Sequence, residues 1–546
     1  MRSWQRRALV QYLTTRPRDF LLVATPGSGK TAFALRVGAE LLADGTVERL
    51  TVVVPTEHLK SQWATAAAAA GIALDPKFSN SGARTSRDYH GVVVTYAQVA
   101  NHPMRHRVRT EHRRTLVVFD EIHHGGDAKS WGEGIREAFG DATRRLALTG
   151  TPFRSDDSAI PFVDYTRDEQ GLLRSRADHT YGYADALADS VVRPVVFLAY
   201  SGEARWRTGA GEEHAARLGE PLTAEQTARA WRTALDPAGQ WMPAVIGAAD
   251  TRLRQLREAG MPDAGGMVIA SDQKTARAYA GLLRTITGED PTLVVSDDPG
   301  SSDRIARFAS GTGRWLVAVR MVSEGVDVPR LAVGVYATST STPLYFAQAV
   351  GRFVRCRNPG ETASIFLPSV PSLLALASEL EASRDHVLGK PHRETPFDES
   401  PATALGEQTD PDAGFESLGA DAELDQLIFD GASLRAATPA GSDEEADYLG
   451  IPGLLDASQM RELLRRRRAE HGGEHSTEQS TVHGRLTRLR RELNALVAAT
   501  HHRTGRPHGW IHSELRRICG GPPVAAADGD QLQARIEAVR SLQSSF

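Results

Sequence analysis

The chain has 546 residues, of which 41% are hydrophobic and 24% are charged, a composition typical of a globular protein with room for three or four domains. Its two cysteines, Cys356 and Cys519, each stand alone, which excludes a cysteine zinc site and suits a reducing compartment. Because no apolar run reaches the ~18 residues of a membrane-spanning helix and no signal-peptide pattern opens the chain, we expect a cytoplasmic protein without membrane association. The formal net charge of -4 means that any surface for nucleic acid must be local.

Short β-branched runs alternate with helix-like stretches from Phe20 to about Phe366, the pattern of parallel sheets covered by helices. A first set of strands is predicted at Phe20–Ala24, Leu50–Val54, Val92–Thr95, Leu116–Asp120 and Leu146–Thr149. A second set is predicted at Met267–Ala270, Thr292–Ser296, Trp315–Val319, Val333–Ala337 and Ser364–Leu367. We therefore expect an α/β fold with two tandem doubly wound parallel-sheet domains, residues 1–195 and 196–392, and a polar insertion with helical stretches near 202–237.

The last third of the chain changes its charge abruptly. Arg393–Asp447 carries 15 acidic and 2 basic residues, a net charge of -13, so residues 393–448 are predicted to form a mostly disordered linker. Arg461–Gly520 has 13 arginines against 6 carboxylates, a net charge of +7, and residues 449–546 are predicted to form a small, basic α-helical region. Leucines at helical spacing there favour a core or a partner interface, whereas Arg465–Arg468 would suit phosphate contacts, and both interpretations remain open.

A glycine-rich loop between the first predicted strand and a helix-forming run has the pattern of a phosphate-binding P-loop. Such a loop turns backbone N–H groups toward phosphates at a helix N-terminus. Lys30 is expected to reach the β- and γ-phosphates of ATP, and Thr31 to bind Mg²⁺. The rest of the cradle would be formed by Thr25, Pro26, Gly27, Ser28 and Gly29. The alternative is a chance glycine-rich turn, which a second motif makes harder to defend.

Two carboxylates, Asp120 and Glu121, directly follow the apolar run Leu116–Phe119. In a parallel sheet this position lies at the carboxyl edge, beside the P-loop. We expect Asp120 to hold Mg²⁺ and Glu121 to polarise the attacking water. A solvated turn would not explain two acids immediately after four apolar strand residues.

Together these residues resemble the superfamily 2 helicases, whose two domains are RecA-like, and specifically the branch with Asp-Glu-x-His in motif II, which includes type III restriction and repair helicases. Alanine in place of the first P-loop glycine, as at Ala24, is common in that family. The resemblance implies that Gln5 reads adenine and that Gly325 and Asp327 of motif V bind the nucleotide. It assigns the coupling of hydrolysis to strand movement to His123, Thr149, Thr151 and Gln348, and nucleic-acid contacts to Pro55, Thr56, Thr95 and Tyr96.

Arg352 and Arg355 belong to the stretch Gln348–Arg355, which resembles motif VI. Two arginines three residues apart on a helix face one direction, so both are expected to reach across a cleft to the γ-phosphate as arginine fingers. Because Lys30 and Glu121 lie on the other domain, hydrolysis should require the cleft to close.

The resemblance implies an ATP-dependent DNA helicase or translocase that binds the DNA backbone without sequence preference. Three alternatives stay open. The first is an RNA helicase, the second is a translocase that moves on duplex DNA without separating the strands, and the third is an ATPase switch in a repair, restriction or defence complex. The third alternative would place a protein partner on the C-terminal helices.

Overall fold

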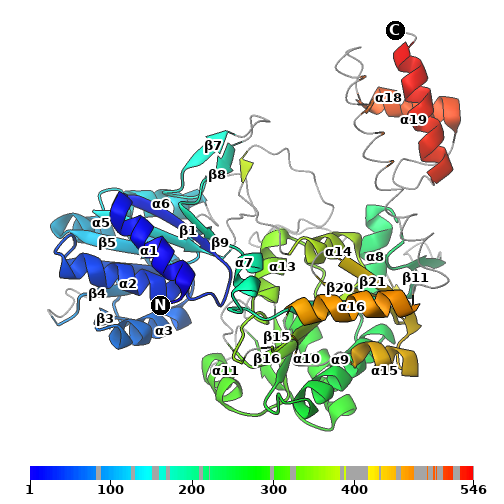
Figure 1. Ribbon diagram of the computed structural model, residues 1–546, viewed down its shortest axis with the longest axis horizontal. Coiled ribbons are helices and arrows are strands. Elements are labelled where there is room, and N and C mark those ends of the chain that lie inside the picture. The colour runs from blue at the N-terminus through cyan, green and yellow to red at the C-terminus, as the bar shows by residue number, and fades with distance from the viewer. Residues whose placement is uncertain are drawn as a thin grey trace.

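Two sheets, the first parallel and the second mainly parallel, lie on either side of residues 182–194 and form the body of the computed structural model (Figure 1). The structure describes residues 1–81, 88–123, 129–150, 159–167, 173–207, 213–220, 222–295, 300–319, 328–358, 360–380, 387–388, 416–429, 432–450, 455, 457–471, 489, 493, 496–497, 500, 508–520 and 529–544.

The first sheet has seven strands in the described part of the chain, all parallel to their neighbours. In spatial order they are β3 (Leu74–Asp75), β4 (Gly91–Thr95), β2 (Arg49–Val54), β5 (Thr115–Phe119), β6 (Arg144–Thr149), β1 (Asp19–Ala24) and β9 (His179–Tyr181). Successive strand residues point to opposite faces of the sheet, so each strand contributes side chains to two hydrophobic clusters. Leu116 and Val118 of β5 lie in one hydrophobic cluster, and Val117 and Phe119 lie in the other.

Helices cover both faces of this sheet (Figure 1). One face packs against α1 (Ser3–Thr15), α2 (Lys30–Ala43) and α3 (Glu57–Ala69). The other packs against α4 (Tyr96–Asn101) and α6 (Lys129–Phe139), and α5 (Pro103–His112) lies against α6. Because the strands are parallel, the loops after β1, β2, β4, β5 and β6 meet at one edge. The P-loop, Pro55, Asp120 and Gly150 therefore follow strands that end side by side.

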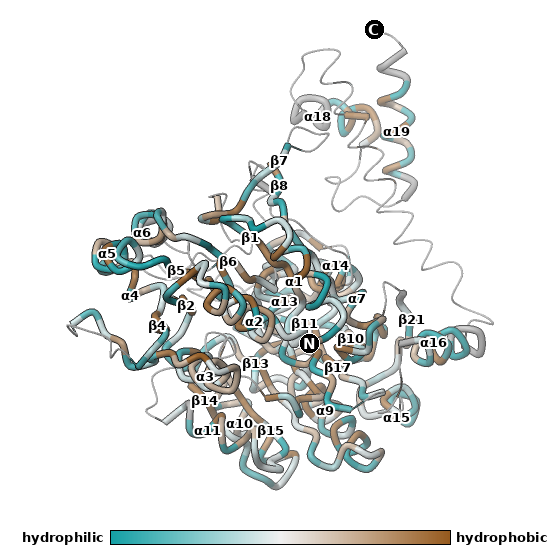
Figure 2. Tube along the Cα trace, turned by 60° about the vertical axis from the view of Figure 1, so that its left-hand side comes forward, coloured by the Kyte–Doolittle hydropathy of each residue, from teal (hydrophilic) through white to brown (hydrophobic). Residues whose placement is uncertain are grey.

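The second sheet has eight strands in the described residues. Six are parallel, in the order β14 (Thr292–Val294), β15 (Trp315–Val319), β13 (Gly265–Ala270), β16 (Leu331–Ala337), β17 (Ala363–Pro368) and β10 (Val195–Ser201). Its helices are α8 (Ala224–Ala234), α9 (Trp241–Glu258), α10 (Gln273–Thr287), α11 (Ser301–Ser310), α13 (Pro343–Val350) and α14 (Pro371–Ser378). The strands are mostly hydrophobic, whereas the helices mix both characters (Figure 2). Every predicted strand matches an observed one to within two residues at either end.

The acidic segment completes the second sheet, which corrects the prediction of a mostly disordered linker over 393–448. β20 (Glu423–Phe429) pairs antiparallel with β10, and β21 (Ala432–Pro439) pairs with β20. The helix α15 (Asp443–Leu449) follows. The charge averaged over the whole segment concealed a short apolar run, because Leu424, Leu427, Ile428 and Phe429 are buried. The prediction is wrong for residues 416–429 and 432–448, and residues 389–415 lie outside the described part of the chain.

The predicted insertion near 202–237 is more β-rich than its sequence indicated. It contains β11 (Glu203–Arg207), β12 (Glu213–Arg217) and α8, and β11 pairs with both β12 and β19 (Glu416–Ala420). A further small sheet joins β7 (Tyr165–Arg167), β8 (Leu173–Ser175) and β18 (Val387–Leu388), so the chain returns toward the first domain after leaving the second. The helix α7 (Tyr183–Ala188) lies in the connection between the two large sheets.

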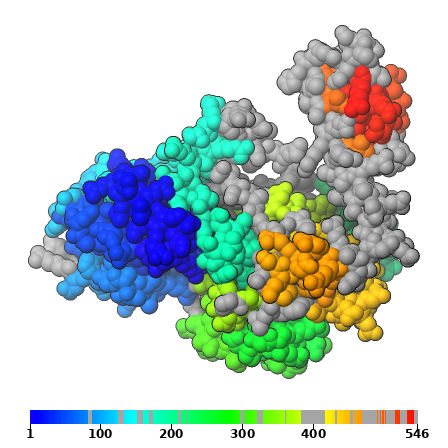
Figure 3. Space-filling model, in the orientation of Figure 1, coloured from blue at the N-terminus to red at the C-terminus, as the bar shows by residue number. Residues whose placement is uncertain are grey.

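The basic C-terminal region divides into two parts. α16 (Ala457–His471) packs on the second domain, with Met460 and Leu464 in the main hydrophobic cluster. α18 (His508–Cys519) and α19 (Gly529–Ser544) lie apart from both sheets (Figure 3). Their apolar side chains form a separate cluster with Leu489, Leu493 and Val497, which identifies a small helical unit with its own core. Among the described residues, no helix combines the length and the apolar character needed to cross a membrane.

The corrected boundary predicts the outcome of truncation. A chain ending at residue 392 loses β20, whose four buried apolar side chains each contribute roughly 1.5–3 kcal/mol, about 6 kcal/mol or more in total, against a domain stability of ~5–15 kcal/mol. We expect this chain to aggregate, because β10 also becomes an open edge. A chain ending at residue 471 keeps the sheet and should be soluble and folded. Size-exclusion chromatography and circular dichroism of the two chains test the boundary, and a monomeric, folded 1–392 chain would contradict it.

Candidate nucleotide-binding cleft

The loop after β1 has the geometry of a phosphate cradle. Gly27 and Gly29 adopt φ values of +76° and +100°, a backbone region that favours glycine, and α2 begins at Lys30. The N-terminal residues hold this loop from behind: Arg2 Nη1 donates to Ser28 O at 2.8 Å and Trp4 Nε1 donates to the same oxygen at 3.3 Å. The loop is therefore fixed before any ligand arrives, with backbone N–H groups at the N-terminus of α2.

Gln5, predicted to read adenine, takes part in the same support. Its Nε2 donates to Gly29 O at 3.0 Å, its Oε1 accepts the Arg2 N–H at 2.7 Å, and its side chain is buried. Arg2, and not Gln5, lines the cleft in front of the P-loop. Thr25 and Ser28 are buried as well, so they shape the loop from within. An adenine contact by Gln5 stays a prediction.

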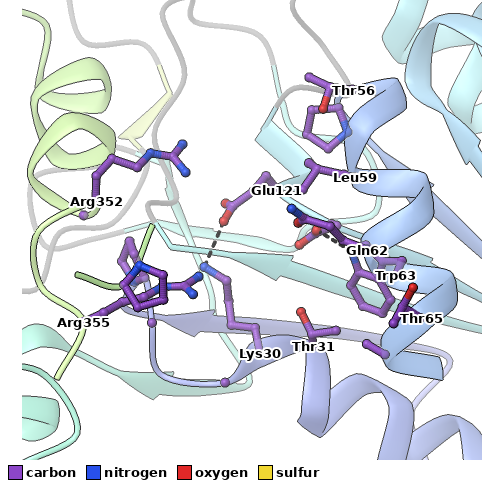
Figure 4. A pocket seen from close by; sticks show the side chains of 18 of the residues that line it. Lys30, Thr31, Thr56, Leu59, Gln62, Trp63, Thr65, Glu121, Arg352 and Arg355 are labelled. Carbon is purple, nitrogen blue, oxygen red and sulfur yellow. Dashed lines mark hydrogen bonds and ion pairs between the residues drawn. The ribbon is translucent and has the colours of Figure 1, made fainter. Parts of the chain in front are cut away.

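Lys30 and Glu121 form an ion pair at the centre of the cleft (Figure 4). Lys30 Nζ lies 2.9 Å from Glu121 Oε1 and donates to Ala24 O at 3.1 Å, and Glu121 Oε2 accepts the Gly150 N–H at 3.0 Å. Burial alone would raise the pKa of the Glu121 carboxyl, but the positive charge of Lys30, with smaller effects of His123 and Gly150, holds that pKa well below its usual range. Glu121 is thus an anion at neutral pH.

Two aromatic donors hold Asp120 beside this pair. Trp63 Nε1 of α3 donates to Asp120 Oδ2 at 2.7 Å, and the Tyr96 hydroxyl donates to the backbone O of Asp120 at 2.9 Å. Thr31 and Asp120 line the same cleft. Hydroxyl and carboxylate oxygens are the ligands that Mg²⁺ prefers, so this donor set fits the ion. Among the described residues, the cleft included, no group of three or more His, Cys, Asp or Glu side chains could hold a metal ion, so Mg²⁺ here would depend on the bound nucleotide for further ligands.

The four residues predicted to contact nucleic acid divide into two that are buried, Thr95 and Tyr96, and two that line the cleft, Pro55 and Thr56. Tyr96 is fully buried and positions Asp120, and Thr95 is buried with its Oγ1 accepting the Gln98 N–H at 3.1 Å as the cap of α4. Their burial leaves little side-chain surface for a nucleic-acid strand, and their contact with one stays a prediction. Pro55 and Thr56 do line the cleft, at the start of α3. Their contact with nucleic acid stays a prediction.

A polar chain connects the two domains behind the ion pair. His123 Nδ1 lies 3.0 Å from Thr149 Oγ1 at the end of β6, and His123 Nε2 lies 3.2 Å from Gln348 Nε2 on α13 of the second domain. His123 and Thr149 are buried. The structure thus brings together three of the four residues predicted to couple the domains. The fourth, Thr151, lies outside the described residues, as do Gly325 and Asp327.

The two predicted arginine fingers face the P-loop, but not from a helix. α13 ends at Val350, Arg352 lies in the following turn, and Arg355 forms an isolated β-bridge with Val192. The prediction that both arginines share a helix face is therefore wrong, because Gly351 ends the helix early. Both nevertheless line the cleft (Figure 4).

Glycines let the second domain come close to the P-loop. A Cβ built on Gly351 would lie 2.8 Å from Pro26 Cγ, and one built on Gly27 would lie 3.0 Å from Arg355 Cγ. The segment Gly351–Arg355 is called the arginine loop below. A larger side chain at Gly27 or Gly351 would push this loop away from the phosphate cradle.

Arg193 is a residue of this site that no sequence pattern indicated. Its side chain is fully buried, its Nε donates to Phe353 O at 2.6 Å, and it also donates to Leu331 O. It pairs with Glu361 at 3.3 Å, and burial lowers the pKa of its guanidinium to about 10. A lone arginine before a strand carries no sequence signal, yet here it ties the arginine loop to the connection between the domains.

The cleft has a volume of about 1030 Å³ and lies between the two sheets. It is lined from the first domain by the P-loop, the acidic pair and α3, and from the second by the arginine loop. Its lining includes Pro26, Gly27, Gly29, Lys30, Thr31, Pro55, Thr56, Asp120, Glu121, Gln348, Arg352 and Arg355. A basic and glycine-rich wall facing an arginine loop suits a nucleoside triphosphate.

Comparison with known proteins gives the family. An uncharacterized protein of Mycobacterium tuberculosis (strain CDC 1551 / Oshkosh) is 72% identical over 560 residues, covering 100% of this chain and 93% of its own length. A protein of Mycobacterium leprae (strain TN), also described as uncharacterized, is 69% identical over 561 residues, covering 100% of this chain and 94% of its own. The chain belongs to the same family as these mycobacterial proteins.

More distant similarities cover parts of the chain. Residues 1–154 match the family model described as type III restriction enzyme, res subunit. A DNA 3'-5' translocase of Sulfurisphaera tokodaii is 23% identical over 382 residues, covering 65% of this chain and 78% of that protein. Among solved structures, S. cerevisiae Dbp5 bound to RNA and ADP BeF3 has a TM-score of 0.44 at 14% identity, covering 70% of this chain and 88% of that one. The two sheets with a P-loop cleft between them form a RecA-like α/β core.

The ion pair predicts how nucleotide affinity responds to mutation. Glu121→Gln removes the partner that competes with phosphate for Lys30, so we expect it to bind Mg²⁺-free ADP about threefold to tenfold more tightly than the wild type. Lys30→Ala removes the cation itself and should weaken binding about tenfold or more. Isothermal titration calorimetry of the three proteins measures both effects. Equal affinities of Glu121→Gln and wild type would show that the pair does not oppose phosphate binding.

Proposed function

We propose that the protein is an ATP-dependent motor on DNA, a helicase or translocase that couples ATP hydrolysis between its two domains to movement along the strand. One observation carries this proposal: a single cleft is lined by the P-loop lysine, by the acidic pair Asp120 and Glu121, and by Arg352 and Arg355 from the other domain. These groups cover the charge requirements of phosphoryl transfer, which depends mainly on positioning and electrostatic stabilisation.

In the proposed reaction each residue has one task. The N–H groups at the start of α2 and the amine of Lys30 bind the β- and γ-phosphates. Thr31 and Asp120 would hold Mg²⁺, which would neutralise charge on the phosphate oxygens. Once phosphate takes Lys30, the carboxylate of Glu121 is released to polarise the attacking water. Arg352 and Arg355 stabilise the charge that spreads over the γ-phosphoryl oxygens in the transition state.

Coupling follows from the division of the site between domains. The chain Thr149–His123–Gln348 crosses from the first domain to the second directly behind Glu121. A change in the position of Glu121 when nucleotide binds would alter this chain, and cleft closure would bring the arginine loop onto the γ-phosphate. ATP then favours the closed state by its additional contacts, and product release reopens the cleft.

DNA is the proposed track. The Sulfurisphaera tokodaii relative is a DNA 3'-5' translocase, and the family model matched by residues 1–154 describes a restriction subunit. Pro55 and Thr56 precede α3 at the rim of the cleft, where a strand bound across the domains would influence the nucleotide site. Contacts of such a motor go to the sugar-phosphate backbone, so binding should weaken strongly with salt.

A partner-controlled ATPase is a second candidate, supported by the separate helical unit. The cluster around Leu493, Leu515, Leu532 and Ile536 has its own core, distinct from that of the two sheets. Such a unit can bind a protein partner without disturbing the motor. In this case the partner, and not DNA alone, would set the rate of hydrolysis.

ATP hydrolysis measured alone and with single-stranded DNA, duplex DNA or single-stranded RNA tests the main proposal. We expect DNA to stimulate hydrolysis, and we expect Glu121→Gln to abolish the stimulated rate. Arg355→Ala should lower the stimulated kcat by about 10³-fold or more, because an arginine finger contributes that much in related phosphoryl transfers. Stimulation by RNA alone would change the track, and a normal rate in Arg355→Ala would refute closure. No stimulation by any nucleic acid would favour the partner-controlled ATPase.

The interdomain chain predicts a separation of basal from stimulated activity. Thr149→Val keeps the shape of the side chain but removes the hydroxyl that lies 3.0 Å from His123. We expect it to reduce DNA stimulation about tenfold, since losing one buried hydrogen bond costs about 1–1.5 kcal/mol, while the affinity for ATP stays within twofold. Thr149→Ser keeps the hydroxyl and is the matched control. Equal stimulation in the Val and Ser variants would exclude this chain from coupling.

A further inference from the structure

Trp63 donates its indole N–H to a carboxylate that the proposed function needs. It lies on α3, is 2% exposed, and its Nε1 is 2.7 Å from Asp120 Oδ2. Figure 4 shows the ring projecting from α3 on the side of the cleft opposite Arg355. The aromatic ring belongs to the hydrophobic cluster between α2, α3 and the first sheet, which fixes the position of the N–H.

Asp120 is thereby fixed at two points. The Tyr96 hydroxyl holds its backbone oxygen, and Trp63 holds one carboxylate oxygen. An indole has a single donor and no acceptor, so its bond holds Oδ2 in one place and restricts the rotation of the carboxylate. A carboxylate turned in advance toward the P-loop loses less conformational freedom when it takes up a metal ion.

Three other tryptophans with a described indole partner differ from Trp63 in that they donate to backbone oxygens or to a carboxylate outside the cleft. Trp4 and Trp241 donate to backbone oxygens, of Ser28 and Ser201. Trp315 donates to the Asp250 carboxylate at 2.9 Å, in the second domain and outside the cleft lining. Trp63 instead donates to the carboxylate that lies beside Lys30, Thr31 and Glu121.

We propose that Trp63 is a positioning residue for the metal site: its N–H orients the Asp120 carboxylate so that Mg²⁺ binds with the nucleotide. The inference rests on the proposed function, in which Asp120 holds that ion. Partners that orient a metal-binding carboxylate typically contribute 10–100-fold to metal affinity or activity. Because Trp63 is on α3, which begins directly after Pro55 and Thr56, the same contact connects the rim of the cleft with the metal site.

Metal affinity tests this directly, without requiring turnover. Mn²⁺ binding in the presence of ADP is measured by the electron paramagnetic resonance signal of free Mn²⁺, for the wild type, Trp63→Phe and Trp315→Phe. We expect Trp63→Phe to bind Mn²⁺ about 10–100-fold more weakly and Mg²⁺-free ADP within twofold of the wild type. Trp315→Phe removes an equivalent indole-to-carboxylate bond outside the cleft and should bind Mn²⁺ as the wild type does.

Indole N–H signals provide a second measurement on the unmutated chain, should Trp63→Phe fail to fold. The chain has 8 tryptophans, so ¹⁵N-indole labelling gives few resonances. The Trp63 resonance, assigned by Trp63→Phe or by Trp63→Tyr, should shift with Mg²⁺ and ADP and broaden with Mn²⁺. Paramagnetic broadening of none of the eight resonances would place the metal away from Trp63 and overturn the proposal.

The outcomes separate this inference from the proposed function. If wild type and Trp63→Phe bind Mn²⁺ and ADP equally well, Trp63 does not position the metal ligand, and the ATPase proposal stands. If the wild type binds no Mn²⁺ with ADP, the proposed function itself fails. A loss of Mn²⁺ affinity in both Trp63→Phe and Trp315→Phe would indicate general destabilisation and also overturn the specific role.

Discussion

Lys30 and Glu121 neutralise each other at the carboxyl edge of the first sheet, and the other groups of the cleft are arranged around that pair. The pair brings the residue that would bind phosphate into contact with the residue that would activate water. In the proposed reaction a triphosphate competes for Lys30, so binding the substrate and releasing Glu121 are one event. Gly150 and His123 stabilise the same carboxylate from β6 and from the end of β5, which makes its charge sensitive to the conformation of both loops. In the proposed reaction, hydrolysis therefore begins only after a phosphate has displaced Glu121 from Lys30.

Two contacts connect the second domain with the Lys30–Glu121 pair, and they differ in how rigidly they are held. Gln348 touches His123 through polar atoms that a shift of about 1 Å would separate, because hydrogen bonds depend steeply on distance. Arg355, by contrast, is held by backbone: its bridge to Val192 and the bonds of Arg193 to Phe353 and Leu331 make the arginine loop rigid with respect to the interdomain connection. We therefore expect the second domain to close as a rigid body. The arginine loop would keep its shape, and the His123–Gln348 contact would form or break as the distance between the domains changes.

Parallel strands could be predicted from the sequence because a strand buried on both faces must be apolar throughout, and the motifs that follow such strands must meet at one edge. That reasoning placed Lys30, Asp120 and Glu121 together, and the resemblance of Gln348–Arg355 to motif VI brought Gln348 to the same cleft. The sequence-based predictions failed in two places, where a net charge was averaged over a long segment and where a glycine ended a helix early. The net charge of the acidic segment masked the four apolar residues of β20, and Gly351 ended α13 before the arginines that were assigned to its face. Arg193 and Trp63 carry no pattern at all, since a buried arginine and a core tryptophan look ordinary until their partners are known.

Two aromatic donors, Trp63 and Tyr96, hold Asp120 in a defined orientation beside the ion pair. A charged pair can be held loosely and still attract phosphate, but a metal-binding carboxylate must face its ion within narrow limits. Tyr96 from α4 and Trp63 from α3 approach Asp120 from two helices, packed on opposite faces of the sheet. A shift of α3 or α4 relative to the sheet would therefore move Asp120, whereas Arg2 and Trp4 hold the P-loop in place. With a rigid phosphate cradle and two movable helices, a contact at the surface of α3 would alter the proposed metal site and leave the affinity for nucleotide unchanged.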